Sequence, residues 1–162
     1  MSSLNRTRKR DKVGCEFEVG ICGPESSPDI KKMYDGFLMR AISQGLPPAE
    51  KQTRDRWIEN LLEFGRNVLT WVEGNAVGHA AIIPDFDRGD GEYVIFVSEP
   101  FRNRGLGTAL TQLAVEDSRS IGLNRLWLTV ESYNFIALRL YRNAGFKAVD
   151  LGEREITMIL RL

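Results

Sequence analysis

The order of apolar and polar positions along the chain predicts strands and helices in alternation. Phe17, Val19 and Ile21 alternate with polar or small residues, which is typical of a strand with one buried face. Ser27 and Pro28 form a favourable helix start. Apolar residues then recur at helical spacing, at Ile30, Met33, Tyr34, Phe37, Leu38 and Ala41. The breaker Gly45-Leu46-Pro47-Pro48 precedes a second helix, whose inward face carries Trp57, Ile58, Leu61 and Leu62.

The remaining pattern predicts a mixed α/β domain. Strands are expected over residues 68–73, 76–83, 92–97 and 126–130, with Gly74-Asn75 as a hairpin turn and residues 85–91 as a polar loop. One helix follows residue 108 and ends near Gly122, another ends at Gly145, and two short strands lie within 149–162. The predicted order is β-α-α-β-β-β-α-β-α-β-β, an α/β (α+β) fold whose mixed central sheet has six to seven strands and four helices.

Composition narrows the classes of partner. The 162 residues include 22 basic and 22 acidic side chains, so no global field favours nucleic acid or an anionic membrane. No apolar run approaches the ~18 residues of a membrane-spanning helix, and the first residues lack the apolar core of a secretion signal. We therefore expect a cytoplasmic protein without a membrane or nucleic-acid partner. No Cys/His cluster has metal-binding spacing, so no metal is expected.

Two further expectations concern the N-terminal part. The basic cluster within residues 6–12 indicates a flexible basic tail over 1–14, ahead of a single domain over 15–162. Cys15 and Cys22 have opposite side-chain parity along the first strand, which argues against a disulfide between them and suits a reducing compartment.

Candidate chemistry is concentrated in Arg102-Asn103-Arg104-Gly105-Leu106-Gly107, between a strand and a helix. Glycine allows close approach of a ligand to the backbone, because it has no Cβ. The first turn of the helix offers unpaired N–H groups and the positive end of a dipole, which suit a phosphate or diphosphate. The third glycine of a dinucleotide fingerprint is replaced by Leu110, and no P-loop string exists. The pattern therefore indicates a different nucleotide-like cofactor.

A second motif lies downstream, from Asn134 to Phe146, after the strand at 126–130. Asn134, Ala137, Leu138 and Tyr141 share one face of a short helix, and Gly145 suits the left-handed position that ends it. The pair of motifs, Arg-x-x-Gly-x-Gly and then Asn with Leu-Tyr-x-x-x-Gly-Phe, resembles the two cofactor motifs of the GCN5-related N-acetyltransferases, the GNAT superfamily.

The resemblance implies that acetyl-CoA binds between the strands at 92–97 and 126–130. The backbone of Phe96 and Val97 would bond its pantetheine arm, and amides around the glycines would hold its diphosphate, with Arg102 and Arg104 either adding charge or merely solvated. The implied cofactor-binding residues are Phe96, Val97, Arg102, Arg104, Gly105, Leu106, Gly107, Thr108, Asn134, Ala137 and Tyr141.

Transfer of an acetyl group to an amine requires a base and a proton donor. A lysine-like amine has a pKa near 10.4, so its neutral form costs roughly 4–5 kcal/mol at pH 7. The resemblance implies Tyr141 as donor to the departing thiolate and Glu92 as base. Tyr141 packed beneath Phe146 without a chemical role, and Glu92 as an exposed edge charge, are the alternatives. His79, the one histidine, is either a packing residue or a second candidate base.

The sequence leaves the acceptor open. A small amine or amino-acid-like compound and a protein lysine or N-terminal amine both fit an N-acetyltransferase that works by direct transfer in a ternary complex. A non-catalytic acyl-CoA-binding module is the alternative from another class. Residues of the first two helices and their connection are the candidates for acceptor specificity: Tyr34, Phe37, Arg40, Gln44, Leu46, Arg54 and Trp57. The resemblance also leaves a homodimer open.

Overall fold

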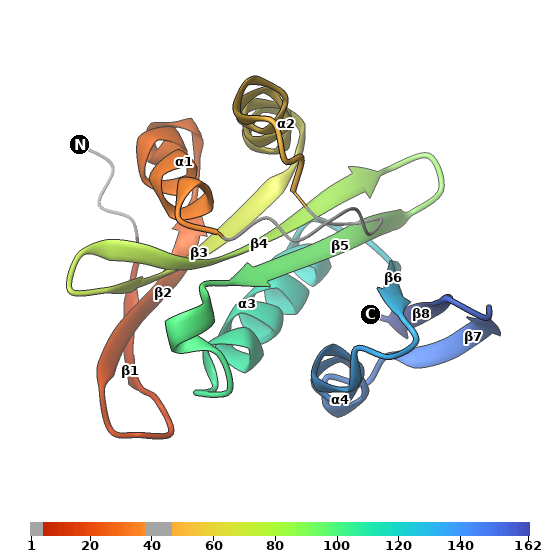
Figure 1. Cartoon of the computed structure of the whole chain (residues 1–162). Helices are drawn as coiled ribbons and strands as arrows, with labels where there is room; N and C mark the ends of the chain where they lie inside the picture. Colours follow the sequence, from red (N-terminus) through yellow and green to blue (C-terminus); the bar gives the residue numbers. More distant parts are fainter. Residues whose placement is uncertain (1–4, 38–46) are drawn as a thin grey trace.

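The strands of the protein form one mixed sheet in the order β1-β2-β3-β4-β5-β6-β8-β7, in a computed structural model that describes residues 5–37 and 47–162 (Figure 1). All neighbouring strands are antiparallel except β5 and β6, which are parallel. The strands are β1 (Thr7–Arg10), β2 (Glu16–Cys22), β3 (Arg66–Val72), β4 (Asn75–Asp85), β5 (Asp90–Val97), β6 (Arg125–Glu131), β7 (Lys147–Leu151) and β8 (Glu155–Arg161).

Helices cover both faces of this sheet (Figure 1). Helices α1 (Ser27–Asp35) and α2 (Lys51–Phe64) lie on one face, and α3 (Leu106–Ser120) and α4 (Phe135–Asn143) lie on the other. Two single 3₁₀ turns precede α1 and α3. No helix among the described residues is both long and apolar enough to cross a membrane. The predicted fold class is therefore confirmed, with eight strands among the described residues in place of six or seven.

Each face of the sheet has its own apolar core, as the alternation of side chains along a strand requires. The larger core joins the sheet to α3 and α4, and includes Leu110, Leu126, Leu128 and Met158. The second core joins the sheet to α1 and α2 around Ile30, Tyr34, Ile58 and Trp71.

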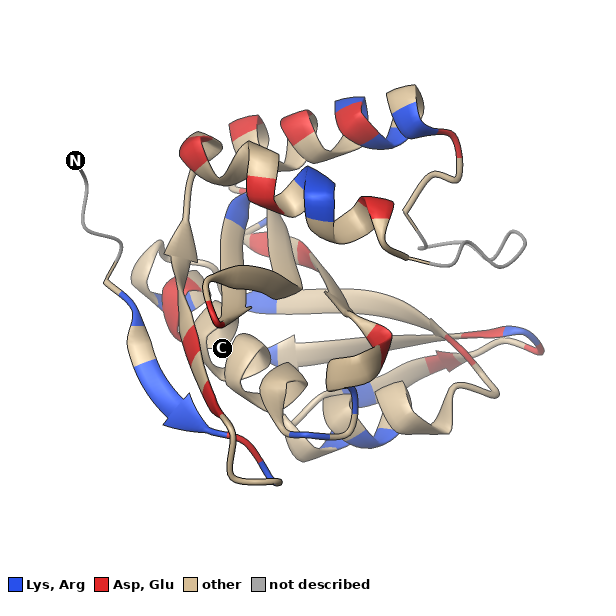
Figure 2. Cartoon of the chain, turned by 60° about the vertical axis from the view of Figure 1, so that its left-hand side comes forward, with Lys and Arg blue, Asp and Glu red and all other residues tan. Residues whose placement is uncertain are grey.

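The prediction of a flexible tail over residues 1–14 is wrong where the structure describes this segment, because residues 7–10 form strand β1. Its backbone pairs with β2 from Thr7–Val19 to Arg10–Glu16. Ion pairs across the two strands join Arg6 and Arg8 to Glu18, at 3.1 and 3.5 Å. Figure 2 shows basic residues along β1 beside acidic residues of β2. Charge complementarity and backbone bonds thus replace the apolar alternation that would have revealed a strand.

Two smaller differences concern the limits of elements. Strand β4 continues to Asp85 and β5 begins at Asp90, so the predicted loop shortens to a turn of residues 86–89. Helix α1 ends at Asp35, and the predicted helical positions Leu38 and Ala41 lie outside the described residues. At the C-terminal end, β8 inserts between β6 and β7, and both cysteines are free as predicted.

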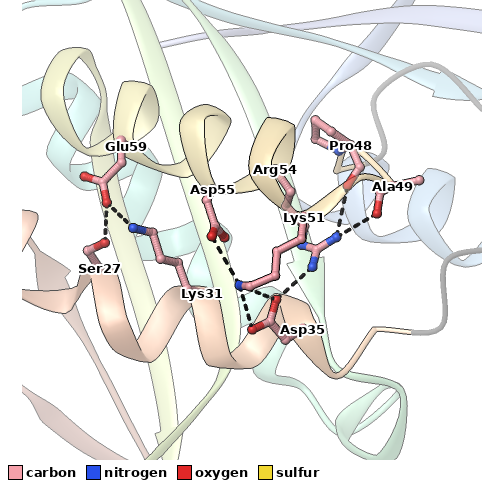
Figure 3. A network of polar contacts seen from close by, with 9 residues as sticks. All are labelled: Ser27, Lys31, Asp35, Pro48, Ala49, Lys51, Arg54, Asp55 and Glu59. Carbon is pink, nitrogen blue, oxygen red and sulfur yellow. Dashed lines mark hydrogen bonds and ion pairs between the residues drawn. The ribbon is translucent and has the colours of Figure 1, made fainter.

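A polar network joins α1 to α2 and to Pro48 and Ala49, which precede α2 (Figure 3). The Arg54 guanidinium donates to the carbonyl oxygen of Ala49 at 2.9 Å and to Asp35 Oδ1 at 2.7 Å. The Arg54 side chain is only 8% exposed. Lys51 bonds Asp35 and Asp55 from the surface, both at 3.2 Å. At the other end of the two helices, Glu59 of α2 accepts from the hydroxyl of Ser27 in α1 at 2.7 Å.

We expect Arg54→Met to destabilise the fold far more than Lys51→Met does. The first change removes a buried guanidinium that bonds the Ala49 carbonyl and Asp35, and should lower the free energy of unfolding by about 2–3 kcal/mol. The second removes a mostly exposed partner of the same Asp35 and should cost less than about 1 kcal/mol. Denaturant unfolding of both variants tests this. Equal losses would contradict the central place of Arg54.

Candidate functional site

The candidate site begins where two neighbouring strands separate. Strand β5 pairs with β6 over three residues only: Asp90–Arg125, Gly91–Leu126 and Glu92–Trp127. Beyond these pairs, β5 continues beside β4 on its other edge, and β6 continues beside β8. The described strands therefore open from Tyr93 and Leu128 onward, and backbone groups facing this opening lack a strand partner.

The register with β4 decides which residues of β5 face the opening. The N–H of Ser98 donates to the Val77 carbonyl at 2.8 Å, so Ser98 is bonded toward β4. Hydrogen bonding alternates along an antiparallel pair, which directs the backbone of Phe96 toward β4 and that of Ile95 and Val97 toward the opening. Contrary to the prediction, Phe96 is therefore not placed to offer its backbone to a ligand in the opening, whereas Val97 is.

The first turn of α3 lies at the wide end of this opening and has no side-chain cap. Gly105 is its N-cap residue, in the left-handed region with φ +93°. The N–H groups of Leu106, Gly107 and Thr108 are the first of the helix, so they have no partner within it. A Cβ built on Gly107 would lie 3.3 Å from Leu140 Cδ2 and 3.8 Å from Ile95 Cδ1. A side chain there would fill the space between β5 and α4, which fits the predicted need for glycine.

The two arginines of the first motif, Arg102 and Arg104, are both hydrogen-bonded to other residues of the protein. Arg102 Nε donates to the Val97 carbonyl at 2.9 Å, so its exposed side chain folds back along the end of β5. Arg104 Nε donates to Asp11 Oδ2 at 2.6 Å, and the Arg104 side chain is 20% exposed. Its charge is therefore already paired within the protein. Nothing local to the first motif in the sequence pointed to Asp11.

The second motif builds the wall of the opening formed by α4. The Asn134 side chain accepts from the Ala137 N–H at 3.2 Å and caps the helix, which leaves its amide N–H₂ group for other contacts. Gly145 adopts φ +100°, as predicted for the residue that ends α4. The exposed Thr108 and the partly buried Leu140 line a groove of about 270 Å³ between α3 and α4.

Tyr141 lies on the α3–α4 face of the sheet. Its ring packs 5.8 Å from that of Phe146 and 6.4 Å from that of Tyr93. Burial raises the pKa of Tyr141 to about 12, so its hydroxyl keeps its proton at neutral pH. The Tyr93 hydroxyl is committed to Thr111 at 2.9 Å. Tyr141 thus packs against Phe146 and carries a protonated hydroxyl at neutral pH.

Glu92 lies on the opposite face, because side chains alternate along β5. It is half-buried, and desolvation raises its pKa above the usual range for a glutamate. No ion-pair partner for Glu92 exists among residues 5–37 and 47–162. A carboxylate with a raised pKa and no cation beside it is a stronger base than an exposed one.

A hollow of about 620 Å³ surrounds Glu92. It is lined by Ile83, Pro84, Asp85, Phe86, Asp87, Arg88, Asp90, Glu92 and Trp127. Four of these side chains are carboxylic acids and one is a guanidinium, and Asp90 also bonds Arg125 at 2.8 Å. The hollow therefore carries a local negative charge, although the net charge of the whole chain is zero.

His79 is a structural residue in this protein. Its Nε2 lies 2.9 Å from Asn67 Oδ1, which can only accept, and its Nδ1 lies 2.8 Å from the Tyr34 hydroxyl. Asn67 in turn donates to the Leu61 carbonyl at 2.7 Å. This series of hydrogen bonds connects α1, β4, β3 and α2. Complete burial lowers the pKa of His79 to about 3, so His79 is neutral and fully occupied, as the packing alternative predicted.

The acceptor candidates of the first two helices are divided by the structure. Tyr34 is fully buried and Arg54 is held in the polar network, so neither is free to contact a ligand. Phe37 and Trp57 pack against Tyr34 and are partly buried. Three candidates, Arg40, Gln44 and Leu46, lie outside the described residues. No group of metal-ligating side chains occurs in the described part of the chain.

Comparison with known proteins identifies one family. The sequence model of the acetyltransferase (GNAT) family matches residues 33–146. The L-methionine sulfoximine/L-methionine sulfone acetyltransferase of Pseudomonas aeruginosa is 28% identical over 107 residues, which cover 62% of each chain. A mycothiol acetyltransferase of Beutenbergia cavernae is 40% identical over 67 residues, which cover 41% of this chain and 22% of that protein. The chain thus spans less than two thirds of the length of these relatives.

Solved structures show the same architecture. The GNAT domain of PAT from S. lividans has a TM-score of 0.78 with 10% identity, over 97% of each chain. The structure of yncA from Salmonella typhimurium with its cofactor acetyl-CoA has a TM-score of 0.71 with 19% identity, over 90% of this chain and 93% of that one. At these identities the likeness concerns the fold.

We predict that His79→Gln changes the pH dependence of stability. The unfolded chain binds a proton at His79 below about pH 6.5, but the folded protein does so only near pH 3. The contribution of neutral His79 to the free energy of unfolding is complete above pH 6.5. It is lost as the pH falls below 6.5, at a rate that approaches about 1.4 kcal/mol per pH unit. The stability difference between wild type and variant should therefore shrink from pH 7 to pH 5. Denaturant unfolding at each pH measures it, and parallel profiles would contradict the assignment.

Proposed function

The chain belongs to the acetyltransferase (GNAT) family, and on this basis we propose that it moves the acetyl group of acetyl-CoA to a primary amine. Transfer is direct, within a ternary complex of enzyme, acetyl-CoA and amine. The observation that carries the proposal is the separation of β5 from β6 after Glu92 and Trp127. This separation creates an opening with the uncapped amides of α3 at one end. The two candidate catalytic side chains, Glu92 and Tyr141, lie on opposite faces of the sheet.

The residues of the opening fit acetyl-CoA. The amides of Leu106, Gly107 and Thr108 suit the diphosphate, since they are unpaired at the positive end of a helix. The outward-facing backbone of Ile95 and the N–H of Val97, whose carbonyl accepts from Arg102, suit the amides of the pantetheine arm. Asn134 retains its N–H₂ donors while it caps α4. These contacts need neither the charge of Arg104 nor the backbone of Phe96.

The chemistry divides between the two faces. Glu92 accepts a proton from the acceptor ammonium, directly or through water, and the neutral nitrogen then attacks the thioester carbonyl carbon. The carbon–sulfur bond breaks, and the CoA thiolate takes the proton of the Tyr141 hydroxyl. The amide nitrogen releases its second proton to solvent, and Tyr141 and Glu92 return to their starting states by exchange with water. A pKa of about 12 means that the Tyr141 hydroxyl still carries its proton at neutral pH when the thiolate forms.

The hollow around Glu92 favours an acceptor that carries positive charge near its reacting nitrogen. Asp85 and Asp87 are exposed at its rim, and Trp127 offers an aromatic face to a cation or an apolar side chain. Relatives named for methionine sulfoximine and for mycothiol support a small acceptor, but they match only part of their length. We therefore propose a small primary amine or an exposed lysine-like side chain, without a particular compound.

A cofactor-binding module without turnover is the alternative. Such a protein needs the α3 amides but has no use for a half-buried, unpaired Glu92 facing a negatively charged hollow. The retention of Glu92 and Tyr141 on opposite faces of one opening favours the enzyme.

The first test is release of free thiol from acetyl-CoA with a panel of primary amines. We expect Tyr141→Phe to lower turnover about 100-fold, as loss of a proton donor does, while the Kd for CoA changes less than about twofold. Tyr93→Phe is the matched control, because the Tyr93 hydroxyl is bonded to Thr111 and should leave turnover intact. No thiol release by the wild type with any amine, despite CoA binding, would favour the non-catalytic module.

The second test is the pH–rate profile of Glu92→Gln. The basic form of Glu92 is active, so wild-type turnover should rise as the pH passes the raised pKa of this group and then level off. The variant should lose this limb and about 100-fold in turnover. Asp87→Asn, at the exposed rim of the same hollow, is the control for a general change in charge. A variant profile with the wild-type shape would remove Glu92 as the base.

A further inference from the structure

The turn between β1 and β2, residues 11–15, is fastened to the turn that precedes α3. Asp11 Oδ2 accepts from Arg104 Nε at 2.6 Å, and Asp11 Oδ1 accepts from the backbone N–H groups of Val13 and Cys15, at 3.0 and 2.8 Å. The Asp11 side chain is 1% exposed. Its two carboxylate oxygens thus bond the β1–β2 turn on one side and Arg104 on the other.

A main-chain bond reinforces this junction. The Lys12 N–H donates to the Arg104 carbonyl at 2.9 Å. Arg104 stands between two left-handed residues, Asn103 with φ +60° and Gly105 with φ +93°. A left-handed conformation is unfavourable for a residue with a side chain, even where asparagine tolerates it better than most. The middle residue of this unusual turn is held from two directions, directly before the first free amides of α3.

The same junction places a second cation at the start of α3. The Lys12 side chain runs alongside Gly105, since a Cβ built there would lie 3.8 Å from Lys12 Cγ and 3.9 Å from Lys12 Cε. Lys12 is exposed, and no carboxylate pairs with its ammonium in the described part of the chain. Arg104, by contrast, has its charge matched by Asp11.

We propose that the β1–β2 turn is part of the cofactor site: Lys12 supplies the positive charge beside the diphosphate of acetyl-CoA, and Asp11 is the positioning residue that holds the turn and Arg104. The inference rests on the proposed function. The diphosphate is the phosphate group assigned to Lys12, because Lys12 adjoins Gly105 immediately before the amides of Leu106 and Gly107. An ammonium in this exposed place attracts an anion by a Coulomb term that salt weakens.

The test is calorimetric titration of CoA, and of dephospho-CoA without the 3′-phosphate, at low and high salt. Lys12→Ala should raise the Kd for both ligands about threefold to tenfold and flatten the salt dependence. Asp11→Asn should raise the Kd at least as much and speed amide hydrogen exchange at residues 105–108. Lys9→Ala, an exposed lysine within β1, is the matched control and should bind like the wild type.

Each outcome decides the proposal. Wild-type affinity and salt dependence in Lys12→Ala would overturn it, and a loss confined to CoA with its 3′-phosphate would overturn the assignment to the diphosphate. If Asp11→Asn does not fold, the Lys12→Ala titration alone decides. A wild-type protein that binds neither ligand would overturn the proposed function and this inference with it, whereas tight wild-type binding with unchanged variants overturns the inference alone.

Discussion

The parallel pairing of β5 with β6 ends after Glu92 and Trp127, and the arrangement of the whole site depends on this early end. Had the ladder continued, the backbone of Val97 would be bonded to a neighbouring strand and no ligand could enter the sheet. Because it stops, one edge of β5 keeps backbone polar groups without a strand partner, and of these the Val97 carbonyl accepts from the Arg102 side chain. The alternation of side chains then places Tyr93 beside Tyr141 on one face and Glu92 in the acidic hollow on the other.

The two faces of the sheet are stabilised by different forces. The α3–α4 face is held by a continuous apolar core, which presents the first turn of α3 and the ring of Tyr141 at fixed positions. The α1–α2 face has a smaller apolar core and adds two polar systems, the Arg54 network and the buried chain through His79. Buried polar groups require defined partners and geometry, whereas apolar contacts tolerate sliding. The α1–α2 side of the sheet is therefore the more directionally specified one.

Most of the fold could be predicted from the sequence, because its elements carry local signals. The alternation of Phe17 and Val19, the start of α1 at Ser27-Pro28 and the left-handed Gly145 all correspond to observed features. Strand β1 was missed because Thr7–Arg10 has no apolar alternation, and its partner strand is identified only by pairing across space.

The candidate site was predictable to the extent that it consists of glycine positions and alternation along one strand. The close approach of neighbours at Gly107 and the left-handed Gly145 belong to this part. The ion pair of Arg104 with Asp11 spans 93 positions, so neither residue indicates the other in a single sequence. The orientation of the Phe96 backbone was equally hidden, because it depends on the register with β4 and not on residue type.

The outer strand β1 carries a pattern of charges that bears on self-association. An outer strand presents unpaired backbone groups that can recruit another chain, and closely spaced charges discourage such addition. Strand β1 carries Arg8, Lys9 and Arg10 in succession, all exposed. A second molecule that extended the sheet here would have to bring its backbone alongside this row of cations. Growth of the sheet at this margin is thus opposed by electrostatic repulsion.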